Sequence, residues 1–159
     1  ETEYLAELSL NYPFHVRFID YMPLGSPSIH PDQQILTPEV KHVLKERFGA
    51  LQPVAKSDLD GPAKRFRIKD AKGEVGFITP VSNHFCSSCN RIRLVATGGL
   101  RPCLLHDHET DILTPLRSGA SCDDIEKLVI RTIKSKPAAH NLMNEHGNCV
   151  AGQMTSIGG

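Results

Sequence analysis

The sequence predicts a mixed α+β fold, and three features lead to that prediction. A dense apolar and aromatic run within 13–25, FHVRFIDYM, is followed by a proline and a glycine, which is typical of a strand that leads into a loop. Apolar residues recur at helical spacing in 37–48 and in 121–134. Between these helices, 63–80 is predicted to form two antiparallel strands joined by a loop that contains Gly73.

The first strand is expected to present alternate side chains to the core. Val16 and Phe18, and with them Tyr21, are predicted to be buried. Arg17 and Asp20 are predicted to lie outside the core. This strand should therefore have one face for packing and one for other contacts.

The two helices have recognisable ends. Thr37 is a good N-cap, Pro38 suits the first helical position and Gly49 supplies the stop, so a helix of about three turns is expected. Ser121 is predicted to cap the second helix, which runs to about Lys134.

The composition is that of an ordinary soluble protein, with 40% hydrophobic and 23% charged residues among 159. Basic and acidic residues number 18 each, so no net field would attract nucleic acid or an anionic membrane. No apolar run approaches the ~20 residues of a membrane span, and the first residues lack a secretory signal. We expect a cytoplasmic protein, or a mitochondrial-matrix protein in a eukaryote. Because the chain begins with Glu1 rather than Met, a fragment is expected.

The strongest chemical signal is the spacing C-x2-C-x13-C-x2-H, formed by Cys86, Cys89, Cys103 and His106. If His106 completes the set, the site is a closed Cys3His structural zinc site. If it does not, three cysteines suit a 4Fe-4S cluster with one open iron. Spacing alone favours the zinc site and leaves the cluster as the alternative.

Two arginines follow the first cysteine pair on a segment, RIRLVA, that is predicted to be a strand paired with LRPCLL. Arg91 and Arg93 are two residues apart, so on a strand they would point the same way. Paired guanidinium groups suit a polyphosphate. The alternative is an ordinary pair of exposed arginines on a solvated strand.

Three segments resemble a known family. They are VRFIDYMPLG, GEVGFITPVSNHFCSSCNRIRLVATGGLRPCL and the terminal GG, and they are similar to the carboxy-terminal half of the GTP 3',8-cyclases of molybdenum cofactor biosynthesis. These are radical S-adenosylmethionine enzymes. The resemblance implies that 1–50 is the terminal strand and helix of an incomplete TIM-like (β/α) barrel. It implies that 51–159 is a hairpin-containing 4Fe-4S and GTP-binding region with a GG tail.

The resemblance also implies a reaction and its cofactors. The family converts GTP to 3',8-cyclo-GTP by radical chemistry, which requires S-adenosylmethionine and a second 4Fe-4S cluster. Both belong to an amino-terminal half with a CxxxCxxC motif, which is absent here. This chain alone is therefore expected to be inactive and to reach S-adenosylmethionine only through that missing half. A homodimer is compatible with the family, and the exact match of the ending predicts the natural carboxy terminus.

Individual roles follow from the same resemblance. Cys86, Cys89 and Cys103 become ligands of a cluster whose open iron takes the guanine, so the cluster displaces zinc as the favoured interpretation. Met22 would lie against S-adenosylmethionine, although a core methionine is the plainer alternative. The last two glycines, Gly158 and Gly159, would reach the active site and act at the chemical step. The residues predicted to bind GTP are Arg17, Arg91, Ile92 and Arg93.

Overall fold

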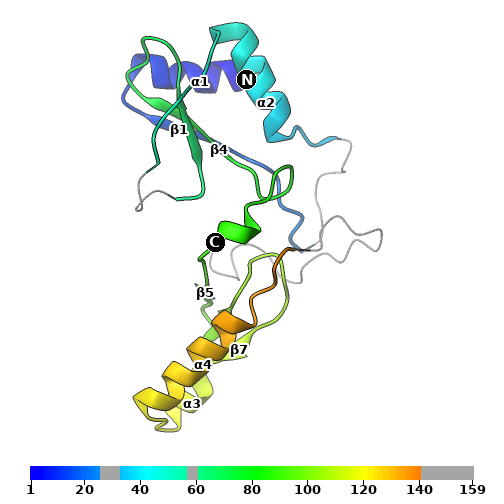
Figure 1. Cartoon of the computed structure of the whole chain (residues 1–159), viewed down its shortest axis with the longest axis vertical. Coiled ribbons are helices and arrows are strands. Elements are labelled where there is room, and N and C mark those ends of the chain that lie inside the picture. The colour runs from blue at the N-terminus through cyan, green and yellow to red at the C-terminus, as the bar shows by residue number, and fades with distance from the viewer. Residues whose placement is uncertain (26–32, 57–60, 141–159) are drawn as a thin grey trace. The chain divides into compact units, whose positions relative to one another are not determined.

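The computed structural model describes residues 1–25, 33–56 and 61–140 (Figure 1). These belong to two compact units, one within Glu1–Met22 and Ile29–Phe85 and the other within Pro23–Ser28 and Cys86–Gly159. The mixed α+β prediction is confirmed, because each unit combines helices with a small sheet. The predicted division after residue 50 refers to the barrel of a longer protein and stays a prediction.

The first unit is built on a four-stranded sheet. Its strands are β1 (His15–Ile19), β2 (Gln52–Pro53), β3 (Lys64–Arg67) and β4 (Glu74–Ile78), in the order β1-β4-β3-β2. The predicted hairpin is confirmed, since β3 and β4 pair antiparallel, and β1 pairs with β4 in parallel. At the loop, Gly73 is required because a Cβ there would collide with the backbone of Phe14. The close approach brings β1 alongside β4.

Two helices, α1 (Thr2–Asn11) and α2 (Thr37–Phe48), contact each other and the sheet. The sequence prediction missed α1, whose buried residues are only Ala6 and Ser9. Such a narrow face gives little periodic signal. The core of this unit joins both helices to the strands through the cluster Ala6, Val40, Leu44, Leu51, Ile68, Val75 and Phe77.

The start of α2 differs from the prediction. Leu36 is the N-cap, and its backbone N–H donates to a carboxylate oxygen of Glu39 at 3.3 Å. Thr37 is instead the first helical residue, and its side chain bonds to Asp20. The predicted helix and its end at Gly49 are confirmed, with Gly49 at φ 78°.

The second unit carries a three-stranded antiparallel sheet. Its strands are β5 (Arg93–Leu94), β6 (Gly99–Arg101) and β7 (Thr110–Asp111), in the order β5-β6-β7. The helices are α3 (Leu113–Arg117) and α4 (Cys122–Lys134). The hairpin and α4 were predicted, and the cap is confirmed because the side chain of Ser121 accepts from the amide of Asp124 at 3.2 Å. The short elements β7 and α3 were not predicted.

None of the helices in the described ranges combines the length and the apolar composition of a transmembrane span.

Candidate metal centre

The three cysteines of the motif lie in the second unit, on two segments that flank the β5–β6 hairpin. Cys86 opens a 3-10 turn, Cys86–Ser88, and its carbonyl accepts from the amide of Cys89 at 3.1 Å. Cys103 follows the last residue of β6 by two positions. All three are partly buried free thiols, whereas Cys122 is exposed at the start of α4. Cys149 lies outside the described residues.

The pKa of the Cys103 thiol depends on burial and on the groups around it, which include the other two cysteines. Burial raises the pKa of Cys103 above its usual value, and the charges of Cys86 and Cys89 raise it further. The backbone N–H of Leu105 and the ammonium group of Lys136 lower it without cancelling the rise. Cys103 is therefore within electrostatic reach of both Cys86 and Cys89. A metal centre would supply the positive charge that such thiolates need.

The segment around Cys103 is held by hydrogen bonds from two basic side chains. Lys136 Nζ donates to the carbonyl oxygens of Arg91 and Pro102, at 2.7 Å each. Arg101 is 4% exposed and donates to the carbonyl of His106 at 2.9 Å. Its Nε has no hydrogen-bond partner among the described residues. A buried donor without an acceptor, two residues before Cys103, suits a site that receives an additional acceptor.

The fourth position of the motif, His106, is exposed and its Nδ1 accepts from the amide of His108 at 3.1 Å. No group of three His, Cys, Asp or Glu side chains in the described part of the chain is gathered closely enough for one metal ion. A 4Fe-4S cluster does not require that closeness, because each cysteine binds a different iron. The three thiols, the nearby lysine and the unpaired arginine nitrogen therefore fit a cluster.

The arginines predicted to share one strand face do not do so. Strand β5 begins at Arg93, so Arg91 and Ile92 precede it and the two-residue alternation does not extend to them. Arg91 and Ile92 are exposed, and Arg93 is partly buried. Arg17 is exposed on β1 in the first unit. Their convergence on one ligand stays a prediction.

Of the remaining predicted residues, Met22 is partly buried and lies three residues beyond the end of β1. Gly158 and Gly159 lie outside the described residues. Their predicted roles toward S-adenosylmethionine and in the chemical step are therefore not tested by the fold.

Asp20 was predicted to lie outside the core, and this prediction is wrong. It is 1% exposed. One carboxylate oxygen accepts from the amide of Thr37 at 2.9 Å and from the Thr37 hydroxyl, and the other accepts from the amides of Val81 at 3.3 Å and Ser82 at 2.8 Å and from the Ser82 hydroxyl at 2.8 Å. Burial raises the pKa of Asp20, but the hydrogen bonds from Thr37 and Ser82 together outweigh it, so the pKa is lowered.

Asp20 thus joins the end of β1, the start of α2 and the turn that follows β4. That turn lies just before Cys86 in the sequence. The signal was present, because Asp20 has the same parity along the strand as the partly buried Val16 and Phe18. The alternation of the strand alone would have predicted that the Asp20 side chain faces the core.

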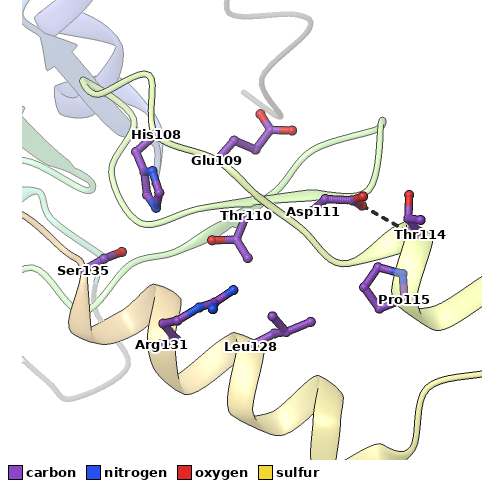
Figure 2. Close-up of a pocket in the computed structure, with 9 residues that line it drawn as sticks. All are labelled: His108, Glu109, Thr110, Asp111, Thr114, Pro115, Leu128, Arg131 and Ser135. Carbon is purple, nitrogen blue, oxygen red and sulfur yellow. Dashed lines mark hydrogen bonds between the residues drawn. The ribbon is translucent and has the colours of Figure 1, made fainter.

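A separate groove of about 670 Å³ lies beside α4 in the second unit (Figure 2). Figure 2 shows Arg131 and Leu128 on the helix below Thr110 of β7, with Pro115 of α3 at one side. Its lining has acidic, basic and apolar members and includes none of the predicted site residues. The lining residues are His108, Glu109, Thr110, Asp111, Thr114, Pro115, Leu128, Arg131 and Ser135.

Comparison with known proteins gives a consistent result. The family model described as Molybdenum Cofactor Synthesis C matches residues 14–142. The chain is 44% identical over 156 residues to the GTP 3',8-cyclase of Pelotomaculum thermopropionicum, covering 98% of this chain and 47% of that protein. It is 42% identical to the GTP 3',8-cyclases of Desulforamulus reducens and Moorella thermoacetica, covering 97% of this chain and 47% of each relative. The chain thus spans about half the length of the curated relatives it matches.

Proposed function

Because this chain belongs to the Molybdenum Cofactor Synthesis C family, we propose that it is the GTP-binding half of a GTP 3',8-cyclase. One observation carries the proposal: a chain 44% identical to such an enzyme has three partly buried free thiols, Cys86, Cys89 and Cys103, and the third is within electrostatic reach of the other two. The activity belongs to the complete protein, in which a further half carries the S-adenosylmethionine chemistry.

The site would bind the two ends of GTP differently. Cys86, Cys89 and Cys103 would hold a 4Fe-4S cluster, and three protein ligands would leave one iron free to act as a Lewis acid toward the guanine base. The guanidinium groups of Arg91, Arg93 and Arg17 are candidates to hold the triphosphate, because planar guanidinium groups donate two parallel hydrogen bonds to phosphate oxygens. These contacts would orient the ribose toward the incoming radical.

The edge of the first sheet supports the presence of a missing half. Strand β1 stands at one end of the sheet, and its outer edge has no strand partner among the described residues. Its pairing with β4 is parallel, and parallel strands are normally covered on both faces. Ile19 nevertheless remains 54% exposed. We infer that β1 is the last strand of an incomplete (β/α) barrel that the amino-terminal half continues, with Met22 near its S-adenosylmethionine site.

The test is anaerobic reconstitution of the chain followed by metal and sulfide analysis. Iron and sulfide together with broad absorption near ~400 nm are expected from a cluster. The Cys86→Ser, Cys89→Ser and Cys103→Ser variants should each lose it, whereas Cys122→Ser, the exposed control, should keep it. One zinc per chain, lost on His106→Ala substitution, would instead indicate the Cys3His structural site and contradict the proposal.

A further inference from the structure

Lys136 joins the two segments that bear the cysteines. Its Nζ lies 2.7 Å from the carbonyl oxygen of Arg91, two residues after Cys89, and 2.7 Å from that of Pro102, immediately before Cys103. Most lysines in proteins extend into solvent, and two short bonds to backbone carbonyls from distant segments are unusual for this side chain. The arrangement therefore calls for a structural reason.

The β5–β6 ladder ends just short of the place where this connection is made. Its outermost pair in the direction of the cysteines is Arg93 with Arg101. Beyond that pair, no ladder bonds hold the described segments of Cys89 and Cys103 at a set separation. The ammonium group of Lys136 therefore connects the two segments just beyond the last backbone hydrogen bonds of the ladder.

The lysine is itself anchored to a regular element. Its backbone N–H donates to the carbonyl of Ile133 at 3.2 Å, in the last turn of α4. One turn earlier on the same helix, Thr132 is 1% exposed, and α4 contacts β6. The side chain thus starts from a fixed point and not from a loose segment.

We propose that Lys136 is a positioning residue that sets the separation of the two cysteine segments and so allows a three-cysteine cluster to form and persist. The inference rests on the proposed function, because it presupposes a cluster. Because the ammonium group of Lys136 is bonded to the carbonyl of Pro102, the residue before Cys103, its positive charge also favours a centre ligated by anionic thiolates. The hydrogen bonds of Lys136 and its charge thus both favour formation of the cluster.

The test replaces Lys136 with Met, which keeps an unbranched side chain only one atom shorter and removes its donors and charge. Lys134→Met is the matched control, because Lys134 is exposed in the last turn of the same helix. After anaerobic reconstitution, the release of iron to a ferrous chelator should be at least tenfold faster in Lys136→Met than in the control. Lys136→Arg, which keeps the charge and can donate to two carbonyls, should restore part of the difference.

Two further measurements separate positioning from simple destabilisation. The electron paramagnetic resonance spectrum of the reduced cluster should change in Lys136→Met, whereas a merely structural role would lower the amount of cluster and leave its spectrum unaltered. Thermal unfolding of the metal-free chains, followed by circular dichroism, shows whether the Lys136→Met variant still folds. If it does not, the positioning role is judged from the rate of iron release in Lys136→Arg compared with that in Lys134→Met.

The outcomes are distinguishable. If the unsubstituted chain takes up no iron and sulfide, the cluster proposal fails and this inference fails with it. If the unsubstituted chain forms the cluster, and Lys136→Met keeps it with the same spectrum and the same rate of iron release as Lys134→Met, only the positioning role of Lys136 is refuted.

Discussion

Replacing Asp20 with Asn should destabilise the first unit strongly, although the two side chains have the same shape. Asn keeps one acceptor oxygen and presents an NH2 donor in place of the other. If the remaining oxygen faces Thr37, the amide N–H groups of Val81 and Ser82 lose their acceptor. Hydrogen bonds to charged groups contribute ~1.5–3 kcal/mol each. The Ser82 bond is short at 2.8 Å and the Val81 bond is longer at 3.3 Å, so one full and one partial loss are expected. The estimate is a loss of ~3 kcal/mol in the free energy of unfolding.

The assay is urea unfolding at pH 7 followed by tyrosine fluorescence. The chain has three tyrosines and no tryptophan, and Tyr4, Tyr12 and Tyr21 all belong to the first unit. Asp70→Asn is the control, because Asp70 is an exposed residue of the same unit at φ 61°, a conformation that Asn tolerates as well as Asp. Its effect should stay within ~0.5 kcal/mol.

The pH dependence gives a second check. The pKa of Asp20 is lower in the folded chain than its ordinary value, so its contribution to stability is complete above the unfolded pKa of ~3.9 and is lost as pH falls through the folded pKa. The difference in stability between the unsubstituted chain and Asp20→Asn should therefore be constant at neutral pH and shrink below about pH 4. Equal stability of Asp20→Asn and Asp70→Asn at pH 7, or a difference that persists unchanged in acid, would refute the reasoning.

Three further changes have expected outcomes. Arg91→Ala should weaken GTP binding by about 10- to 100-fold and guanosine binding far less, measured by calorimetry, because guanosine lacks phosphates; equal losses would contradict the phosphate role. Gly73→Ala should lower the free energy of unfolding by ~3 kcal/mol, since its Cβ would meet the backbone of Phe14, and near-normal stability would contradict that packing. Deleting Gly158 and Gly159 from a complete enzyme should leave cluster content and GTP affinity near normal but stop formation of 3',8-cyclo-GTP. Deoxyadenosine release, measured in the same assay, would show which step is blocked. Normal turnover would instead mean that the two glycines are an ordinary frayed chain end.

Elements with a strong period could be predicted from the sequence, whereas those held by few contacts could not. Strand β1, helices α2 and α4 and the β3–β4 hairpin carry clear apolar patterns, and each is present. Helix α1 buries little more than Ala6 and Ser9, and β7 has two residues, so neither has a pattern long enough to detect. Tertiary pairing determines such short elements, and local sequence has little influence on them.

In the candidate site, too, some residues could be predicted from the sequence and others could not. The cysteines are identifiable because metal ligation requires particular side chains at short spacings. The choice between zinc and a cluster came from family resemblance, since spacing alone favoured zinc. Lys136 could not have been predicted, because its acceptors are backbone carbonyls and any residue type provides those. Asp20 was predicted wrongly for a different reason. The alternation of the strand indicated that its side chain faces the core, but it was predicted to lie outside the core because it is charged.

The outer edge of β1, which no strand in the described part of the chain pairs with, also affects how the chain behaves in solution. An edge strand presents a row of backbone donors and acceptors that another strand can pair with, and apolar side chains such as Ile19 increase that tendency. Arg17 lies on the same strand and opposes it, because bringing two copies together would place like charges near each other. Preparations of the chain by itself should therefore self-associate least at low ionic strength, where the charge of Arg17 is screened least.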